Sequence, residues 1–216
     1  PADEVNNYIK PGTGDIIFIP YLERLNASLC YYKGFNLREE FPKINEWLTL
    51  LENQSTYRGT QGDFHTHAHD LPPQMGGCFK EENPRQIYYS RLIDNGKGLG
   101  DLEINVDNNL NINSKIALQR VIRHRKNIIE SNPCDNDLFE LGLRASLTHL
   151  LTSEINKVDD SCAVGLRFMR DRISVPRDMP IIAARLLRES LEKIASLCDS
   201  DEIIKIPMQH RYDQNP

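Results

Sequence analysis

Apolar residues recur at three- and four-residue intervals through the first quarter of the chain. Between positions 15 and 52 these apolar residues are Ile17, Leu22, Leu25, Leu29, Ile44, Trp47, Leu48 and Leu51. Because this spacing aligns side chains on one face of an α-helix, we predict two helices that bury these residues. The Phe41–Pro42 step marks the expected start of the second helix, since proline is tolerated in a first turn.

The middle of the chain, residues 65–113, loses this period. Its turn-forming pairs include Pro72–Pro73, Gly76–Gly77, Asn83–Pro84 and Asn95–Gly96. Proline and glycine are the residues that most often interrupt regular structure. We therefore predict loops and short strands across this region.

Helical spacing returns in the second half of the chain. We expect Ser114 to be the N-cap of the next helix and Asp178 to cap the last one, with Pro180 in its first turn. A further helix is expected over residues 161–173. The predicted buried positions are Leu118, Val121, Ile122, Ile128 and Ile129, then Leu138, Leu141, Ala145, Leu147, Leu150, Leu151 and Ile155, and finally Ala184, Leu187, Leu191, Ile194 and Ala195.

These patterns predict an all-α fold whose last four helices form a small bundle. We divide the chain into a helical region at 1–75, an irregular connector at 76–113 and a helical extension module at 114–216. The first residues, Pro1–Glu4, have neither an initiator Met nor the features of a signal peptide. We interpret the sequence as the remainder of a longer chain.

Composition narrows the class of protein. Hydrophobic residues are 39% and charged residues 26% of the 216, which is typical of a globular protein. The net charge of -5 disfavours nucleic acid and anionic lipid as partners, and no apolar run approaches the roughly 20 residues that cross a bilayer. The five cysteines form no CxxC pair and are odd in number, which favours a reducing compartment such as the cytoplasm.

Three histidines, His65, His67 and His69, alternate along one short segment. In an extended strand all three rings share a face, whereas in a helix only the first and last do. Three neutral imidazoles suit zinc, and Cys78 or Asp70 could complete a structural site. We favour histidines hydrogen-bonded around turns and assign no metal, and the zinc site stays an alternative.

Other candidate binding residues are aromatic or cationic. Tyr21, Arg24 and Tyr31 could line a pocket that the histidine segment completes. Arg170 and Arg177 could bind an anion through bidentate guanidinium contacts. Ion pairing is the favoured interpretation of this arginine-rich segment, because Arg167 and Asp171 have i, i+4 spacing.

Residues 15–52, DIIFIPYLERLNASLCYYKGFNLREEFPKINEWLTLLE, resemble the C-terminal helical half of a glutathione transferase. Residues 56–78, TYRGTQGDFHTHAHDLPPQMGGC, and 166–179, LRFMRDRISVPRDM, extend the resemblance to the iota-like transferases of cyanobacteria and algae. Members of that class add a second helical module. One departure is Gly12, which stands where the family usually has Ser or Thr three residues before the helix-opening Asp15.

The resemblance implies a function shared with another domain. Glutathione would be the co-substrate, bound mainly by a thiol-activating domain absent from this chain, and no catalytic residue would lie here. A small hydrophobic or thiol acceptor would occupy a cleft formed by Tyr21, Arg24, Tyr31, His65, His67 and His69, for conjugation or thiol transfer. The implied location is the cytoplasm or a plastid. The alternative from a different class is a non-catalytic module that docks a partner or forms a homodimer.

Overall fold

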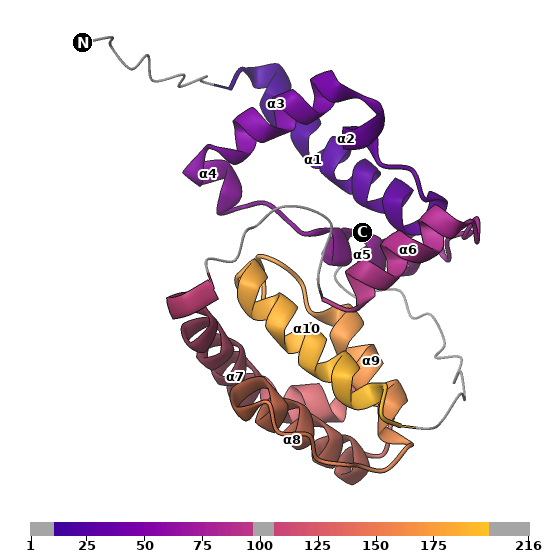
Figure 1. The fold of residues 1–216 in the computed structure, drawn as a ribbon, viewed down its shortest axis with the longest axis vertical. Helices are drawn as coiled ribbons and strands as arrows, with labels where there is room; N and C mark the ends of the chain where they lie inside the picture. The colour runs from indigo at the N-terminus through magenta and orange to yellow at the C-terminus, as the bar shows by residue number, and fades with distance from the viewer. Residues whose placement is uncertain (1–10, 97–105, 199–216) are drawn as a thin grey trace.

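The computed structural model describes residues 11–96 and 106–198, and the regular elements within these ranges are all helical (Figure 1). The all-α prediction is therefore confirmed. The expectation drawn from Pro1–Glu4 lies outside the described residues. The helices are α1 (Thr13–Ser28), the π-helix η1 (Leu29–Lys33), α2 (Leu37–Glu40), α3 (Pro42–Glu52), α4 (Ser55–Arg58), α5 (Phe64–Met75), α6 (Pro84–Asp94), α7 (Val106–Glu130), α8 (Asn136–Thr152), α9 (Cys162–Arg172) and α10 (Ile181–Ala195).

The helices form two groups joined by α5 and α6. Figure 1 shows α1–α4 at one end of the molecule and α7–α10 at the other. Helix α10 packs against α7, α8 and α9, whereas α5 contacts both α1 and α9. Because α5 touches both groups, its side chains are positioned to connect them. None of the described helices combines the length and apolar character needed to cross a membrane.

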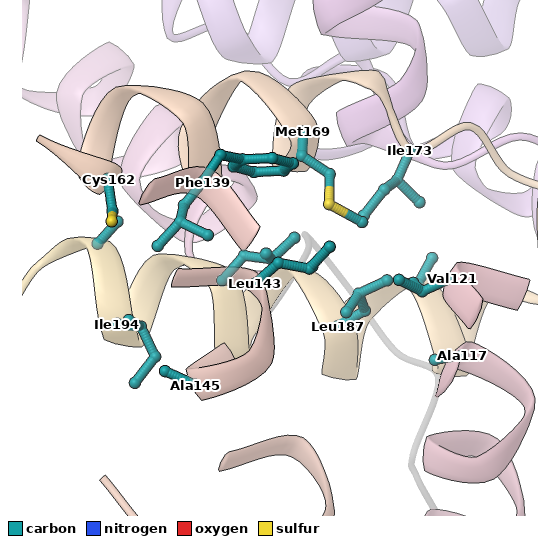
Figure 2. Close-up of a cluster of buried hydrophobic side chains, with 14 of the residues drawn as sticks. Ala117, Val121, Phe139, Leu143, Ala145, Cys162, Met169, Ile173, Leu187 and Ile194 are labelled. Carbon is teal, nitrogen blue, oxygen red and sulfur yellow. The ribbon is translucent and has the colours of Figure 1, made fainter. Parts of the chain in front are cut away.

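The larger hydrophobic core lies among α7–α10. Figure 2 shows Phe139, Leu143, Met169 and Leu187 gathered between these helices, and all four are buried. Small residues allow the close approach of α8 and α9: a Cβ added to Gly142 would lie 3.0 Å from the Cβ of Cys162. Helix α8 packs through the face that carries Phe139, Gly142 and Leu143. Three residues predicted to be buried are therefore exposed: Leu141, Leu151 and, beyond the helix end, Ile155.

Two helices form where loops and strands were expected, so that prediction is wrong. Asp63 caps α5 by accepting a hydrogen bond from the Thr66 amide at 2.9 Å. The Pro72–Pro73 pair falls at the end of α5 and leaves the Ala68 carbonyl without its usual helical donor. The Tyr32 hydroxyl donates to that carbonyl at 2.8 Å, so the helix tolerates the prolines.

Helix α6 begins at a turn signal that the sequence interpretation assigned to a loop. Asn83 accepts a hydrogen bond from the Gln86 amide at 2.9 Å, and Pro84 occupies the first helical position. An N-cap followed by proline is a helix start as well as a turn signal. The irregular connector expected at 76–113 therefore contains α6 and the beginning of α7.

Two predicted helix caps in the second half are also wrong. Helix α7 starts at Val106, so Ser114 lies inside it. Helix α10 starts at Ile181 with Pro180 at its N-cap, and the Asp178 carboxylate instead accepts a hydrogen bond from the Ser174 amide at 2.8 Å. The row of buried apolar residues predicted for α7 is also incomplete, because Ile122 is exposed.

In the first helix, α1, some apolar residues that the helical spacing predicts to be buried are exposed. Ile17 and Leu25 on α1 are exposed, although both were expected to be buried. The helix start uses Gly12, whose amide donates to Asp15 Oδ2 at 2.7 Å. The indole of Trp47 on α3 donates to the other oxygen of Asp15, also at 2.7 Å. One carboxylate thus completes the start of α1 and connects it to α3.

Helix α1 continues into the π-helix η1 before it stops at Gly34, whose φ of 68° is in the left-handed region. The wider turn of a π-helix changes the direction of consecutive side chains, and Cys30, Tyr31 and Tyr32 are all buried. Tyr32 therefore reaches α5, and Tyr31 reaches the end of α6.

Candidate functional site

The histidine segment forms α5 rather than a strand. His65 and His69 are one turn apart and share a face, with ring centroids 4.3 Å apart. His67 lies on another face, where its Nε2 is 3.9 Å from Glu23 Oε2 on α1. The helical alternative is therefore the one that forms, and the three rings do not share one site.

Two aspartates converge on His65 and His69. Asp94 is the last residue of α6, and Asp171 lies in the last turn of α9. One potential metal-ligand atom from each of these four residues lies within 4.8 Å of every other. We call these four residues the His-Asp cluster. Their helices, α5, α6 and α9, come from separate parts of the chain.

The distances inside the His-Asp cluster are short. His65 Nε2 lies 3.6 Å from Asp171 Oδ1, and His69 Nδ1 lies 3.6 Å from Asp171 Oδ2. On its opposite side the His69 ring is hydrogen-bonded through Nε2 to Asp94 Oδ1 at 2.8 Å. His69 is thus held between the two carboxylates.

Neighbouring donors hold both carboxylates in place. The Tyr31 hydroxyl donates to Asp94 Oδ2 at 3.0 Å, and the Tyr31 and His69 rings are in edge contact. Arg170 donates from Nε to Asp171 Oδ1 at 2.7 Å. Tyr31 leaves the Asp94 oxygen that faces His69 free, whereas Arg170 shares Oδ1 of Asp171 with His65.

Burial and charge determine the protonation states of the cluster. Burial, with the neighbouring His69 and Arg188, lowers the pKa of His65 to about 3, so its imidazole is neutral at pH 7. Burial opposes ionisation of Asp171, but His69 and Arg170 hold its pKa well below the ordinary range. Burial opposes ionisation of Asp94 too, and the His69 hydrogen bond keeps its pKa lowered. Neutral imidazole beside ionised carboxylate is the state that binds metal cations.

The predicted cleft residues divide between two places. Tyr31, His65 and His69 lie together in the cluster. Tyr21 is 71% exposed on α1, and the exposed Arg24 donates to Gln74 Oε1 at 3.3 Å. The six residues therefore do not line one pocket.

The arginine-rich segment forms ion pairs. Arg170 is buried and donates to Glu192 Oε2 at 2.5 Å as well as to Asp171. Arg177 is exposed and pairs with Asp178 at 2.9 Å, beside a pocket between α7 and α9. Arg167 pairs with Glu192 rather than with Asp171, so the expected i, i+4 pair is wrong.

The cysteines are free thiols, and the surroundings of four of the five disfavour thiolates. Burial raises the pKa of Cys30 to about 12 and also raises the pKa of Cys78, Cys134 and Cys162. Neither Cys78 nor Asp70 belongs to the His-Asp cluster.

Sequence reasoning missed both aspartates as site residues. Asp94 follows a segment interpreted as loop, and Asp171 was considered only as an ion-pair partner. The available signal was the four-residue spacing of His65 and His69, which puts two imidazoles on one helix face. No local pattern indicates which distant carboxylates would meet them.

Comparison with family models, with curated proteins and with solved structures finds no significant match for this chain.

Proposed function

We propose that this chain is the helical, acceptor-side portion of an iota-like glutathione transferase, and that a domain outside these residues activates the thiol of glutathione. In this function α1 and α3 form the wall against which an electrophile or a mixed disulfide is held. Their contribution to catalysis is proximity and orientation of the acceptor toward the thiolate.

The observation that carries this proposal is the exposed apolar face of α1. Ile17, Phe18, Tyr21 and Leu25 have exposed fractions between 45% and 71%. A contiguous apolar surface of this kind is typical of an interaction or ligand site. In the proposed enzyme the acceptor and the thiol-activating domain cover it.

A groove between α1 and α3 supplies a specific acceptor position. It is lined by Phe18, Leu22, Ile44 and Trp47, beside the Asp15 carboxylate that joins the two helices. Asp15 and Trp47 both belong to the segment that resembles the transferases.

The raised pKa values of the cysteines favour an external thiolate. A transferase needs a stabilised glutathione thiolate or a reactive cysteine, and both require a lowered thiol pKa. Cys30, Cys78, Cys134 and Cys162 have the opposite shift. The chain alone is therefore expected to bind acceptors without turning them over.

The test combines turnover and binding on the chain alone. With glutathione and either 1-chloro-2,4-dinitrobenzene or bis(2-hydroxyethyl) disulfide, we expect no rate above the uncatalysed reaction. The dinitrobenzene probe should nevertheless quench the fluorescence of Trp47, the single tryptophan, with a saturable dependence. Robust turnover, or quenching that does not saturate, would contradict the proposal.

Matched variants locate the binding site. Phe18→Ala and Tyr21→Ala should weaken probe binding at least about threefold, because each removes an aromatic contact of about 1 kcal/mol. Phe79→Ala and Tyr88→Ala make the same changes at exposed aromatics outside the groove and should leave binding unchanged. If Phe18→Ala left probe binding unchanged, the acceptor would not bind at α1, and the proposed site would be wrong.

A further inference from the structure

His65 is a buried polar side chain with unmet bonding capacity. Its exposed fraction is 3%, and neither ring nitrogen has a hydrogen-bond partner within the described parts of the chain. A buried polar group without a partner is costly, because it has given up its hydrogen bonds to water without replacing them. Native proteins seldom keep such a group without a reason, and its Nε2 faces the Asp171 carboxylate.

The atoms around this nitrogen have the separations of a metal-ligand set. His65 Nε2 and His69 Nδ1 each lie 3.6 Å from an oxygen of Asp171. Ligands at roughly 2.1 Å from a tetrahedral ion are about 3.4 Å apart, so these two separations lie within a few tenths of an ångström of those in a metal site. One carboxylate and two imidazoles therefore surround a point suited to a cation.

The surrounding hydrogen bonds orient this set for a cation. The His69 Nε2 is bonded to Asp94, which leaves Nδ1 directed toward Asp171. Such a carboxylate–histidine pair is the usual support of a metal-binding imidazole. Tyr31 holds Asp94 on its far side, and Arg170 holds Asp171.

We propose that His65, His69 and Asp171 bind one divalent first-row metal ion such as Zn²⁺, with Asp94 as the supporting carboxylate behind His69. Two imidazoles and a carboxylate are donors that suit Zn²⁺, Fe²⁺ and Mn²⁺ better than Mg²⁺ or Ca²⁺. A water molecule or a ligand atom completes the coordination. The site does not depend on the transferase function and can be present without it.

The alternative for the same residues is a plain ion-pair network. In that case Arg170, at 2.7 Å, compensates the charge of Asp171, and His65 stays 3.6 Å from the same carboxylate. Both ring nitrogens of the buried His65 are then left without hydrogen-bond partners among the residues that the structure describes. A metal ion would give Nε2 of His65 a partner and would bind His69 and Asp171 at the same point.

The ion would also join parts of the fold. Its ligands come from α5 and α9, and the supporting Asp94 ends α6. Because α5 also packs against α1, the ion would stiffen the connection between the two helical groups. We therefore expect the metal to raise the melting temperature of the whole chain.

The direct test uses the full chain after dialysis against a chelator. Titration with Zn²⁺ should give one ion per chain at an affinity in the micromolar range or tighter, with a rise in melting temperature. Titration with Co²⁺ should give the intense visible absorption of a four-coordinate nitrogen and oxygen site. An absent or substoichiometric response to both ions in folded protein would overturn the proposal.

Variants separate this site from the other histidines. His65→Gln and His69→Gln should each weaken Zn²⁺ binding by more than about 100-fold, and Asp94→Asn by about 10- to 100-fold. The matched control is His67→Gln on the same helix, which faces Glu23 and should bind normally. Circular dichroism verifies that each variant is folded. Binding lost in His67→Gln, or kept in both His65→Gln and His69→Gln, would assign the ion elsewhere and refute the site.

The outcome is independent of the acceptor-binding test on α1. Metal binding can fail while Trp47 reports a saturable acceptor, and the reverse can also occur. Each proposal therefore stands or falls on its own measurement.

Discussion

The guanidinium of Arg188 on α10 is fully buried and donates to both oxygens of the Asp63 carboxylate, 125 residues earlier in the chain. The same guanidinium donates to the Ile173 carbonyl at 2.6 Å. Burial alone would raise the pKa of Asp63, but Arg188 holds it well below the ordinary range. Because Asp63 also caps α5, this pair fixes the start of the helix that carries His65 and His69.

We predict that breaking the Asp63–Arg188 pair destabilises the chain severely. Asp63→Ala leaves a buried cation without its partner, which costs about 3–5 kcal/mol in the free energy of unfolding. Arg188→Met should cost a similar amount, and the double variant should cost less than the sum of the two. Guanidinium chloride denaturation of chelator-treated protein measures these differences.

The control for that prediction is an exposed ion pair. Arg144 and Glu140 on α8 pair at 2.6 Å, but the Arg144 side chain is largely in solvent. Arg144→Ala should therefore change the free energy of unfolding by less than about 1 kcal/mol. A loss in Asp63→Ala as small as this one would mean that the buried pair is not a major contributor.

Gly34 and Gly76 allow backbone strain to be separated from steric clash. Both have positive φ, 68° and 75°. A Cβ at Gly34 would lie 2.5 Å from the Gln86 backbone nitrogen, whereas a Cβ at Gly76 meets nothing within 4 Å. Gly76→Ala should cost about 1 kcal/mol, the strain of an L-residue in this region.

Gly34→Ala should cost at least about 2 kcal/mol more than Gly76→Ala, because α6 must shift away from the end of η1. That shift moves Asp94 relative to Tyr31, so metal affinity should fall as well. Urea denaturation of the two variants gives the comparison. Equal losses would show that the close approach at Gly34 relaxes freely.

The hydrogen bond between Trp47 and Asp15 predicts an acid transition in fluorescence. The Trp47 indole and the Gly12 amide both lower the pKa of Asp15. Because the folded pKa is below the unfolded value of about 3.9, the stabilising contact is complete above that value and is lost as pH falls through the folded pKa. We expect the fluorescence of Trp47 to change with a midpoint below 3.9, while the helical circular dichroism signal persists. Asp15→Asn should abolish this transition, and a midpoint above 3.9 would contradict the contact.

The sequence predicts the fold class well because helical spacing is a local signal. The helices at Pro42–Glu52 and Cys162–Arg172 begin and end close to the expected residues. Helix α5 could not be predicted in this way, because the prolines in its last turn indicate a break. The Tyr32 hydroxyl that satisfies Ala68 comes from a distant segment.

The candidate site was predictable only in part for the same reason. The spacing of His65 and His69 is visible in the sequence, and their common face follows once α5 is known to be a helix. Asp94 and Asp171 are brought to them by the packing of α6 and α9, which no pattern in their neighbourhood indicates. The pairing of Arg188 with Asp63 is equally non-local.

Helical spacing predicts that both Leu187 and Leu141 are buried, but the structure places them in different environments. Leu187 on α10 is fully buried, but Leu141 on α8 is 57% exposed because α8 approaches α9 through the neighbouring Gly142. Leu187→Ala should therefore cost about 2–5 kcal/mol, whereas Leu141→Ala should stay within about 0.5 kcal/mol. Thermal and chemical denaturation of both variants measure the difference, with the circular dichroism spectrum as the check on folding. If Leu141→Ala reduced the free energy of unfolding as much as Leu187→Ala, Leu141 would be a core residue, as the helical spacing predicts. The packing of α8 through its small residues would then be wrong.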